Sequence, residues 1–267
     1  MSALTEAVSD SAVITKRNLI KIKRVPDLLV FTTLSPIMFV LLFAYVFGGA
    51  IDVPGVGYKE FLIAGIFAQT VVFGSTFTGY SLAEDLQKGI IDRFRSLPMS
   101  RSAVLVGRTT SDLLNNILVL IIMVICGLLV GWRTHTSPPE VAAGFLLLLA
   151  FGYAMSWVMA VIGLSVRSVE VAQTAGFIWM FPVTFLSNAF IATDTLPSWL
   201  QPIAEWNPFS SVVLALRDLW GNAPEGLARG DGFPADHPIQ LSVLWIAGLL
   251  VVFIPFAISR YRRAAGR

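Results

Sequence analysis

Few residues of this chain have the types and spacing that catalysis requires. The two histidines, His135 and His237, lie far apart in the sequence, and Cys126 is the only cysteine, which excludes an intramolecular disulfide and a multi-cysteine metal site. No glycine-rich loop ends in Gly-Lys-Ser or Gly-Lys-Thr, the pattern that cradles nucleotide phosphates. We therefore expect the two histidines to be solvated loop residues rather than metal ligands or acid–base groups. The chain is expected to be no enzyme and to hold no cofactor of its own.

One charged run, residues 84–112, has a pattern that suggests binding. Its apolar residues recur at helical spacing and its charged residues take the other faces. The stripe consists of Leu86, Ile90, Ile91, Phe94 and Leu97, and the other faces carry Lys88, Asp92, Arg93 and Arg95. Pro98 ends this predicted amphipathic helix. Two interpretations fit: an interfacial helix whose arginines only fix the topology, or an element that docks into the cleft of a partner.

The composition of the chain limits which elements can position these residues. Of the 267 residues, 55% are hydrophobic and 13% are charged, whereas roughly a quarter of the residues in a soluble domain are charged. This deficit argues against a soluble enzyme, a nucleic-acid binder and a disordered chain. The composition predicts an all-α polytopic membrane protein.

Six segments are long and apolar enough to be transmembrane helices. They cover residues 28–47, 61–82, 113–130, 141–166, 171–192 and 241–258, and none of them contains Asp, Glu, Lys, Arg or His. A proton-coupled antiporter normally needs an ionisable group inside its bundle. The uncharged spans therefore argue against proton coupling and point to an external source of energy.

The basic residues are distributed unevenly between the two sides of these spans. The N-terminal arm, the run 84–112, the turn at Arg167 and the C-terminal tail hold 15 lysines and arginines, and the opposite loops hold 4, among them Arg217. The positive-inside rule then places both termini in the cytoplasm of a cell-membrane protein. We expect an interfacial arm at 1–27, a six-span domain at 28–258 and a basic tail at 259–267.

The long outer loop, residues 193–240, contains two short apolar pieces. The first surrounds Trp199, and the second follows Trp206 and carries a stripe that ends at Trp220. Both pieces are too short to span, so they are expected to be re-entrant or interfacial helices. The tryptophans suit the headgroup level, where they either anchor the protein or form a lid over a lateral exit.

Three runs of sequence resemble the type-2 ABC transporter permeases, in particular the daunorubicin/doxorubicin-resistance branch. The first joins Arg24-Val25-Pro26-Asp27 to a span that ends in Phe43-Ala44-Tyr45-Val46-Phe47-Gly48-Gly49. The second is similar to the coupling segment of that branch and includes Gly89, Ile90, Asp92, Arg93, Phe94, Arg95, Leu97 and Pro98. The third is similar to the motif before the last span and includes Pro197, Trp206, Asn207, Pro208 and Phe209.

The resemblance implies a six-helix permease with an N-terminal interfacial helix, a cytoplasmic coupling helix after the second span and outer re-entrant helices before the sixth. It also implies two separate cytoplasmic ATPase subunits, which would bind ATP and Mg²⁺, and a second permease subunit, identical or related. The second and fifth spans would line the route of the substrate. Their polar residues, Gln69, Thr70, Thr76, Thr184, Ser187 and Asn188, either line this route or form hydrogen bonds between helices.

The function expected from the residues and the resemblance is ATP-driven export of an amphipathic drug-like compound or lipid. Membrane lipid is an expected partner and nucleic acid is not. One alternative is export of a lipid-linked glycan or polymer. The alternative from another class is a structural or assembly subunit of a membrane complex that has no transport path.

Overall fold

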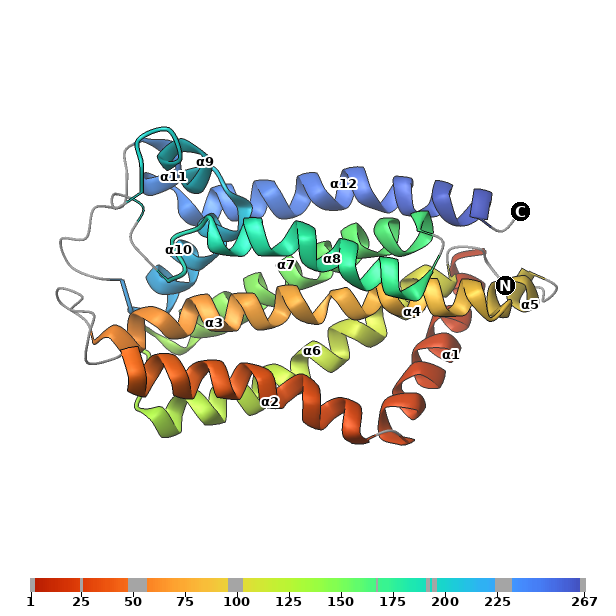
Figure 1. Cartoon of the computed structure of the whole chain (residues 1–267), viewed down its shortest axis with the longest axis horizontal. Coiled ribbons are helices and arrows are strands. Elements are labelled where there is room, and N and C mark those ends of the chain that lie inside the picture. Colours follow the sequence, from red (N-terminus) through yellow and green to blue (C-terminus); the bar gives the residue numbers. More distant parts are fainter. Residues whose placement is uncertain are drawn as a thin grey trace.

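The computed structural model describes residues 3–24, 26–47, 57–95, 103–166, 168–190, 193, 196–223 and 232–264. Within these ranges every regular element is a helix (Figure 1). The predicted all-α fold class is therefore confirmed for the part of the chain that is described.

Six helical segments correspond to the six predicted spans. They are α2 (Pro26–Leu42) with the π-helical turn η1 (Phe43–Phe47), α3 (Tyr58–Gly74) with α4 (Thr76–Gln87), α6 (Ala103–Val130), α7 (Pro138–Ser165), α8 (Val169–Phe185) and α12 (Pro238–Ala264). Among the described residues, four helices are long and apolar enough to cross a membrane: Tyr58–Gln87, Ala103–Val130, Pro138–Ser165 and Pro238–Arg263. The first and fifth predicted spans correspond to the shorter α2–η1 and α8.

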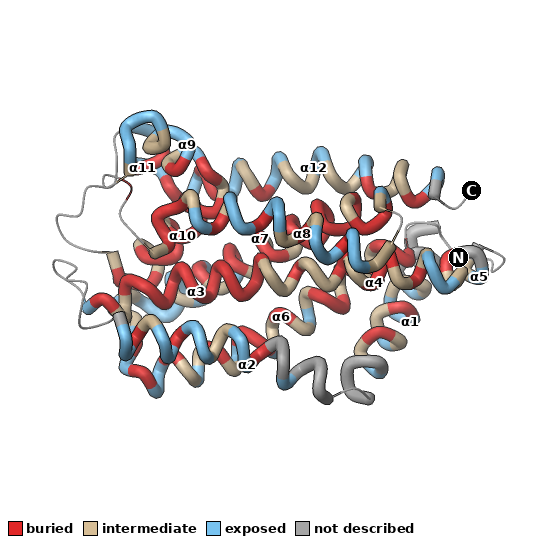
Figure 2. Tube along the Cα trace, viewed as in Figure 1, coloured by how far each residue is buried: buried red, intermediate tan, exposed pale blue. Residues whose placement is uncertain are grey.

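Helix α7 lies at the centre of the molecule and packs against α4, α6, α10 and α12. Figure 2 shows that α3, α7 and α10 are mostly buried, whereas α2 and α12 expose much of their surface. The exposed side chains include large apolar residues such as Leu129, Ile178 and Val251, as expected of helices that face lipid. Of the four long helices, the continuous α3–α4 pair is the least apolar and the most buried.

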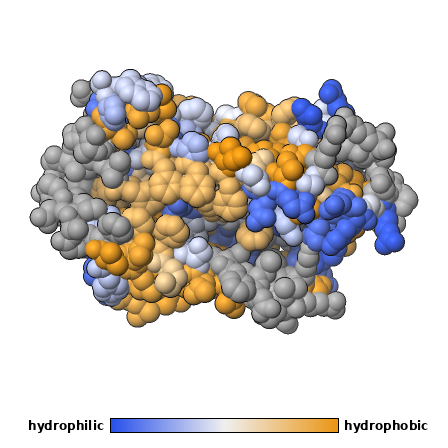
Figure 3. All heavy atoms as spheres, in the orientation of Figure 1, coloured by the Kyte–Doolittle hydropathy of each residue, from blue (hydrophilic) through white to orange (hydrophobic). Residues whose placement is uncertain are grey.

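The two ends of the molecule differ in what they carry. Helix α5 (Ile90–Arg95), the start of α1 (Ala3–Arg24) and the end of α12 share one end, which we call the α5 end (Figure 1). Helices α9 (Gln201–Glu205), α10 (Pro208–Trp220) and α11 (Phe233–Asp236) lie at the other, the α10 end. Apolar side chains cover the middle of the visible face, and strongly hydrophilic ones gather at the α5 end (Figure 3).

Helix α1 runs steeply across the long helices in Figure 1 and packs against α6. Ile14 is almost fully buried, and a Cβ added to Gly107 would lie only 2.7 Å from the Ile14 Cβ. The Thr15 hydroxyl donates to the Gly107 carbonyl at 3.1 Å, and Asn18 Nδ2 donates to Ser111 Oγ at 3.1 Å. The N-terminal helix is thus attached to the start of α6.

The three tryptophans of the outer loop do not share one environment. Trp199 and Trp206 are exposed, in keeping with the predicted headgroup position, but Trp220 is fully buried. Its Nε1 donates to the Val141 carbonyl at 3.3 Å, and its ring packs edge-on against Phe67. The expectation for Trp220 was wrong, because α10 turns its whole apolar stripe towards α3 and α7.

Candidate functional site

The turn between α4 and α5 begins the most suggestive site in the structure. Gly89 has φ +65, and the Gly89 amide donates to the Leu86 carbonyl at 3.1 Å. This left-handed conformation, which favours glycine, ends the preceding helix. The predicted stripe from Leu86 to Leu97 is therefore not one helix: Leu86 belongs to α4, and α5 begins at Ile90.

The apolar face of α5 packs against the chain itself. Ile91 is 1% exposed and lies in a cluster with Leu82, Leu105 and Trp157, and the half-buried Phe94 packs against the same cluster. Ile90 is half-buried and Arg93 is exposed. The side chains of Asp92 and Arg95, and all of Leu97 and Pro98, lie outside the described residues. The part of α5 that a partner can reach includes Arg93 rather than Ile91.

Arg17 connects α1 with both α4 and α5. Its Nη2 lies 3.1 Å from Asp85 Oδ2, and its guanidinium lies 5.1 Å from the centroid of the Phe94 ring. Nearby, Lys88 Nζ donates to Glu84 at 2.5 Å, and this hydrogen bond together with the Glu84 charge raises the pKa of Lys88. The α5 turn is thus held by charge-assisted contacts on one side and by the apolar cluster on the other.

A buried ion pair next to this site was missed in the sequence. Arg108 donates through Nη2 to Asp112 Oδ1 at 2.7 Å and through Nε to Asp112 Oδ2 at 3.1 Å, and the Thr78 hydroxyl also donates to Asp112. The predicted third span began at residue 113, but α6 begins at Ala103 and contains both charged residues. The i,i+4 spacing of Arg108 and Asp112 directly before an apolar run was the available signal.

The residues predicted to line the route mostly bond within their own segments. The hydroxyls of Thr70, Thr76 and Thr184 donate to carbonyls three or four residues earlier, at 2.6–2.9 Å, and Ser187 donates to the Thr184 carbonyl. Gln69 is buried in α3. The side-chain Nδ2 of Asn188 donates to the Ser210 carbonyl at 3.2 Å. These bonds favour a packing role for the hydroxyls.

The motif before the last span joins α8 to α10. Asn207 Nδ2 donates to the Val183 and Leu186 carbonyls, both at 2.7 Å, and Asn207 Oδ1 accepts from the Phe209 amide at 2.9 Å. Pro208 is the first residue of α10, where its lack of an N–H costs nothing. Phe209 is fully buried, whereas Pro197 and Trp206 are exposed. Asn207 is therefore an N-cap that also satisfies the free carbonyls at the end of α8.

Arg217 is a further buried charge that hydropathy does not reveal, because it falls in the segment predicted to be an outer loop. It is 2% exposed, and its three donor nitrogens bond the carbonyls of Phe61 at 3.1 Å, Asn188 at 2.9 Å and Ala189 at 3.0 Å. Its guanidinium lies 3.5 Å from the centroid of the Phe61 ring. Arg217 follows Val213 by four residues and precedes Trp220 by three, a spacing that puts it on the apolar face of α10.

Comparison with known proteins identifies the family. The family model described as ABC-2 type transporter matches residues 11–219, a range that contains the α5 turn, the Arg108–Asp112 pair, Arg217 and most of α10. The chain belongs to the ABC-2 type transporter family. The resemblance inferred from the coupling and outer motifs is confirmed.

Several relatives of this ABC-2 family member are permeases. It is 34% identical to the daunorubicin resistance ABC transporter permease protein DrrB1 of Streptomyces coeruleorubidus, over 97% of this chain and 88% of that one. It is 24% identical to the probable doxorubicin resistance ABC transporter permease protein DrrC of Mycobacterium tuberculosis, over 73% and 66% of the two chains. A putative transport permease, ycf38, of Cyanophora paradoxa is 26% identical over 81% and 76%.

The chain is therefore the permease subunit of an ABC transporter and an integral membrane protein. A permease subunit works with a separate ATPase subunit, so the chain itself is not the ATPase. No group of His, Cys, Asp and Glu residues in the described ranges has a geometry that would hold a metal ion.

Proposed function

We propose that this permease exports an amphipathic drug-like compound or a lipid across the cell membrane, with both termini in the cytoplasm. The names of two relatives, for daunorubicin and doxorubicin resistance, support a drug-like substrate. They give no support to a lipid-linked glycan or to a subunit without a transport path. The 15-to-4 distribution of basic residues and the gathering of hydrophilic side chains at the α5 end (Figure 3) support a cytoplasmic α5 end.

The proposed assembly has two permease subunits, identical or related, and two ATPase subunits that bind ATP and Mg²⁺. Six spans are proposed: α2 with η1, α3 with α4, and α6, α7, α8 and α12. The short α9 and α10 are proposed to be re-entrant from the outer side. Gln69 and Asn188 keep a proposed place on the route, since the Asn188 Oδ1 is buried and has no hydrogen-bond partner among the described residues.

The observation that carries the coupling proposal is the attachment of α5 to the rest of the chain. Its inner face is fixed by Ile91 and Phe94, and Arg17 ties it to α1 and α4. An ATPase subunit that pushes on the outer face of α5 would therefore move several helices together. A switch between two packings of the permease subunits would then follow from ATP-driven closure of the ATPase pair.

The sharpest test of this coupling uses Arg93, because it is exposed and its replacement leaves the apolar cluster intact. Arg93→Glu should weaken binding of the ATPase subunit about tenfold, equivalent to about 1.4 kcal/mol, since it reverses a charge at the contact. Co-purification and substrate-stimulated ATP hydrolysis in proteoliposomes measure the effect. Phe94→Glu is a poorer test, because Phe94 packs inside the chain.

Lys16→Glu is the matched control for Arg93→Glu, because Lys16 is also exposed and lies on α1 at the same end. It should leave ATPase binding and ATP hydrolysis near their wild-type values. Equal ATPase binding by the Arg93→Glu variant and the wild type would contradict the role of α5 as the docking element.

A further inference from the structure

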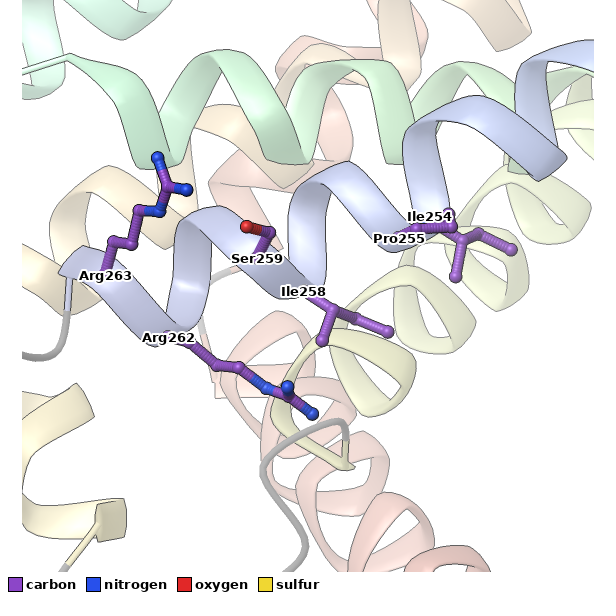
Figure 4. A pocket seen from close by; sticks show the side chains of 6 residues that line it. All are labelled: Ile254, Pro255, Ile258, Ser259, Arg262 and Arg263. Atoms are coloured by element: carbon purple, nitrogen blue, oxygen red, sulfur yellow. The ribbon is translucent and has the colours of Figure 1, made fainter.

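A groove along the last three turns of α12 has the features of a lipid-binding site. It has a volume of about 510 Å³ and is lined by Ile254, Pro255, Ile258, Ser259, Arg262 and Arg263 (Figure 4). The adjoining face of the same stretch is turned inwards, since Ala257 and Tyr261 are buried in the apolar cluster near α5 and the half-buried Ile254 and Ile258 pack against that cluster. The groove therefore runs along the edge of this packed face, with Pro255, Arg262 and Arg263 exposed on its outer side.

The lining residues form two parallel rows with the helical spacing i, i+4, i+8. One row is Ile254, Ile258 and Arg262, and the other is Pro255, Ser259 and Arg263. Each row begins with an apolar residue and ends with an arginine, over a rise of about 12 Å at 1.5 Å per residue. Polarity thus increases along the groove in the same order as along a phospholipid, from acyl chain to phosphate.

The charges at the polar end of the groove favour an anionic occupant. Arg262 and Arg263 are exposed, and Figure 4 shows their side chains pointing to different sides of the end of α12, Arg263 on the side of Ser259 and Arg262 on the side of Ile258. A third arginine, Arg260, lies 5.0 Å from the Phe256 ring on a neighbouring face. Basic pockets beside transmembrane helices on the cytoplasmic side bind anionic headgroups, and guanidinium groups match the geometry of phosphate oxygens.

We propose that the α12 groove binds one anionic phospholipid of the cytoplasmic leaflet, with the phosphate at Arg262 and Arg263 and an acyl chain along Ile254 and Ile258. The inference rests on the proposed orientation, which puts the end of α12 at the cytoplasmic surface. It requires no substrate, no ATPase and no transport. The bound lipid would cover the two exposed arginines and the part of the two isoleucines that the chain itself leaves uncovered.

Native mass spectrometry of the purified chain in detergent tests the proposal with two probes, dioleoylphosphatidylglycerol and dioleoylphosphatidylcholine. The wild type should retain phosphatidylglycerol in preference to phosphatidylcholine. Arg262→Gln with Arg263→Gln should lower the affinity for phosphatidylglycerol about 30-fold, which corresponds to about 1 kcal/mol for each basic residue near an anionic surface. An unchanged affinity in this double variant would overturn the proposal.

Two further variants separate the groove from general attraction to positive charge. Lys16→Gln with Lys88→Gln removes two exposed cations from the same end of the molecule and should leave the binding of phosphatidylglycerol within about twofold. Ser259→Phe fills the groove at unchanged charge and should also abolish the preference for phosphatidylglycerol. If the two lysine substitutions weaken binding as much as the two arginine substitutions, or if Ser259→Phe binds normally, the groove is not the site.

A second copy of this chain is the other occupant that an apolar groove could accept. Ser259→Cys in a Cys126→Ala background tests it, because a short bismaleimide would link two chains whose grooves face each other. We expect no cross-linked dimer in membranes that contain phosphatidylglycerol. Efficient cross-linking would make the groove a subunit interface and overturn the lipid assignment. If the protein turns out not to export a drug-like compound or a lipid, the expected results of these phospholipid-binding and cross-linking experiments stay the same.

Discussion

At the scale of single residues, the most informative feature is a buried cation that bonds main-chain carbonyls. Arg217 donates to three main-chain carbonyls, which belong to α3 and to the turn after α8. The Asn188 and Ala189 carbonyls lie outside the helices, so the guanidinium supplies donors to buried acceptors that no helical hydrogen bond pairs. One side chain thereby joins three segments that are distant in sequence.

Removal of this cation should destabilise the protein. Arg217→Met keeps much of the apolar stem but leaves the three carbonyls without their donor, and we expect a loss of about 2–5 kcal/mol. The stability of Arg217→Lys should fall between that of the wild type and that of Arg217→Met, since an ammonium group lacks the planar fork of five donors. Thermal unfolding in detergent, followed by tryptophan fluorescence, measures the order of the three proteins.

Arg133→Met is the control for the Arg217 variants. Arg133 is also near the α10 end, but it is exposed and bonds only neighbouring carbonyls in its own turn. Its replacement should change the stability by no more than about 0.5 kcal/mol. If Arg217→Met unfolds at the wild-type temperature, the three hydrogen bonds do not stabilise the fold.

At the scale of elements, α4 and α7 approach each other main chain to main chain at Gly79 and Gly163. A Cβ on Gly163 would lie 2.2 Å from the Gly79 carbonyl oxygen, and a Cβ on Gly79 would lie 2.8 Å from the Met159 carbonyl oxygen. Small residues allow such close packing of membrane helices. Because no flexible side chain separates the two backbones, α4 and α7 should move as one unit.

Gly163→Ala should separate these helices and destabilise the protein by about 1–3 kcal/mol, as expected when a packed interface is overfilled. Gly248→Ala is the matched control, because Gly248 lies in α12 with open space around the position of its Cβ. This change should be neutral or stabilise the helix by up to about 1 kcal/mol. The two variants can be compared by thermal unfolding and by the yield of monodisperse protein. Equal behaviour of the two variants would argue against tight contact between α4 and α7.

Much of the element structure could be predicted from the sequence, and the failures have physical causes. Apolar runs predicted α6, α7 and α12, because burial in protein and exposure to lipid both select apolar side chains. Hydropathy could not place the start of α6, since it scores Asp112 as a loop residue although Arg108 and Thr78 satisfy its carboxylate inside the molecule. It also could not place Arg217, whose partners include the Phe61 carbonyl at the start of α3.

At the scale of the whole molecule, the distribution of charge predicts the orientation in the membrane. Lys16 lies at the α5 end and Trp199 near the α10 end, and both are exposed. In a Cys126→Ala background, Lys16→Cys should react with a membrane-impermeant maleimide only after the cells are opened. Trp199→Cys should react in intact cells. The reverse labelling pattern would contradict the proposed cytoplasmic location of the α5 end.

The burial of α3 has a consequence for the synthesis of this protein. The α3–α4 pair is the least apolar of the four long helices and the most enclosed, and its covering helices α7 and α10 follow it in the chain. When α3 leaves the translocon, Gln69 and Thr70 therefore meet lipid before the helices that will cover them have been made. We expect this segment to reach its final place only when the ribosome has delivered the later half of the chain.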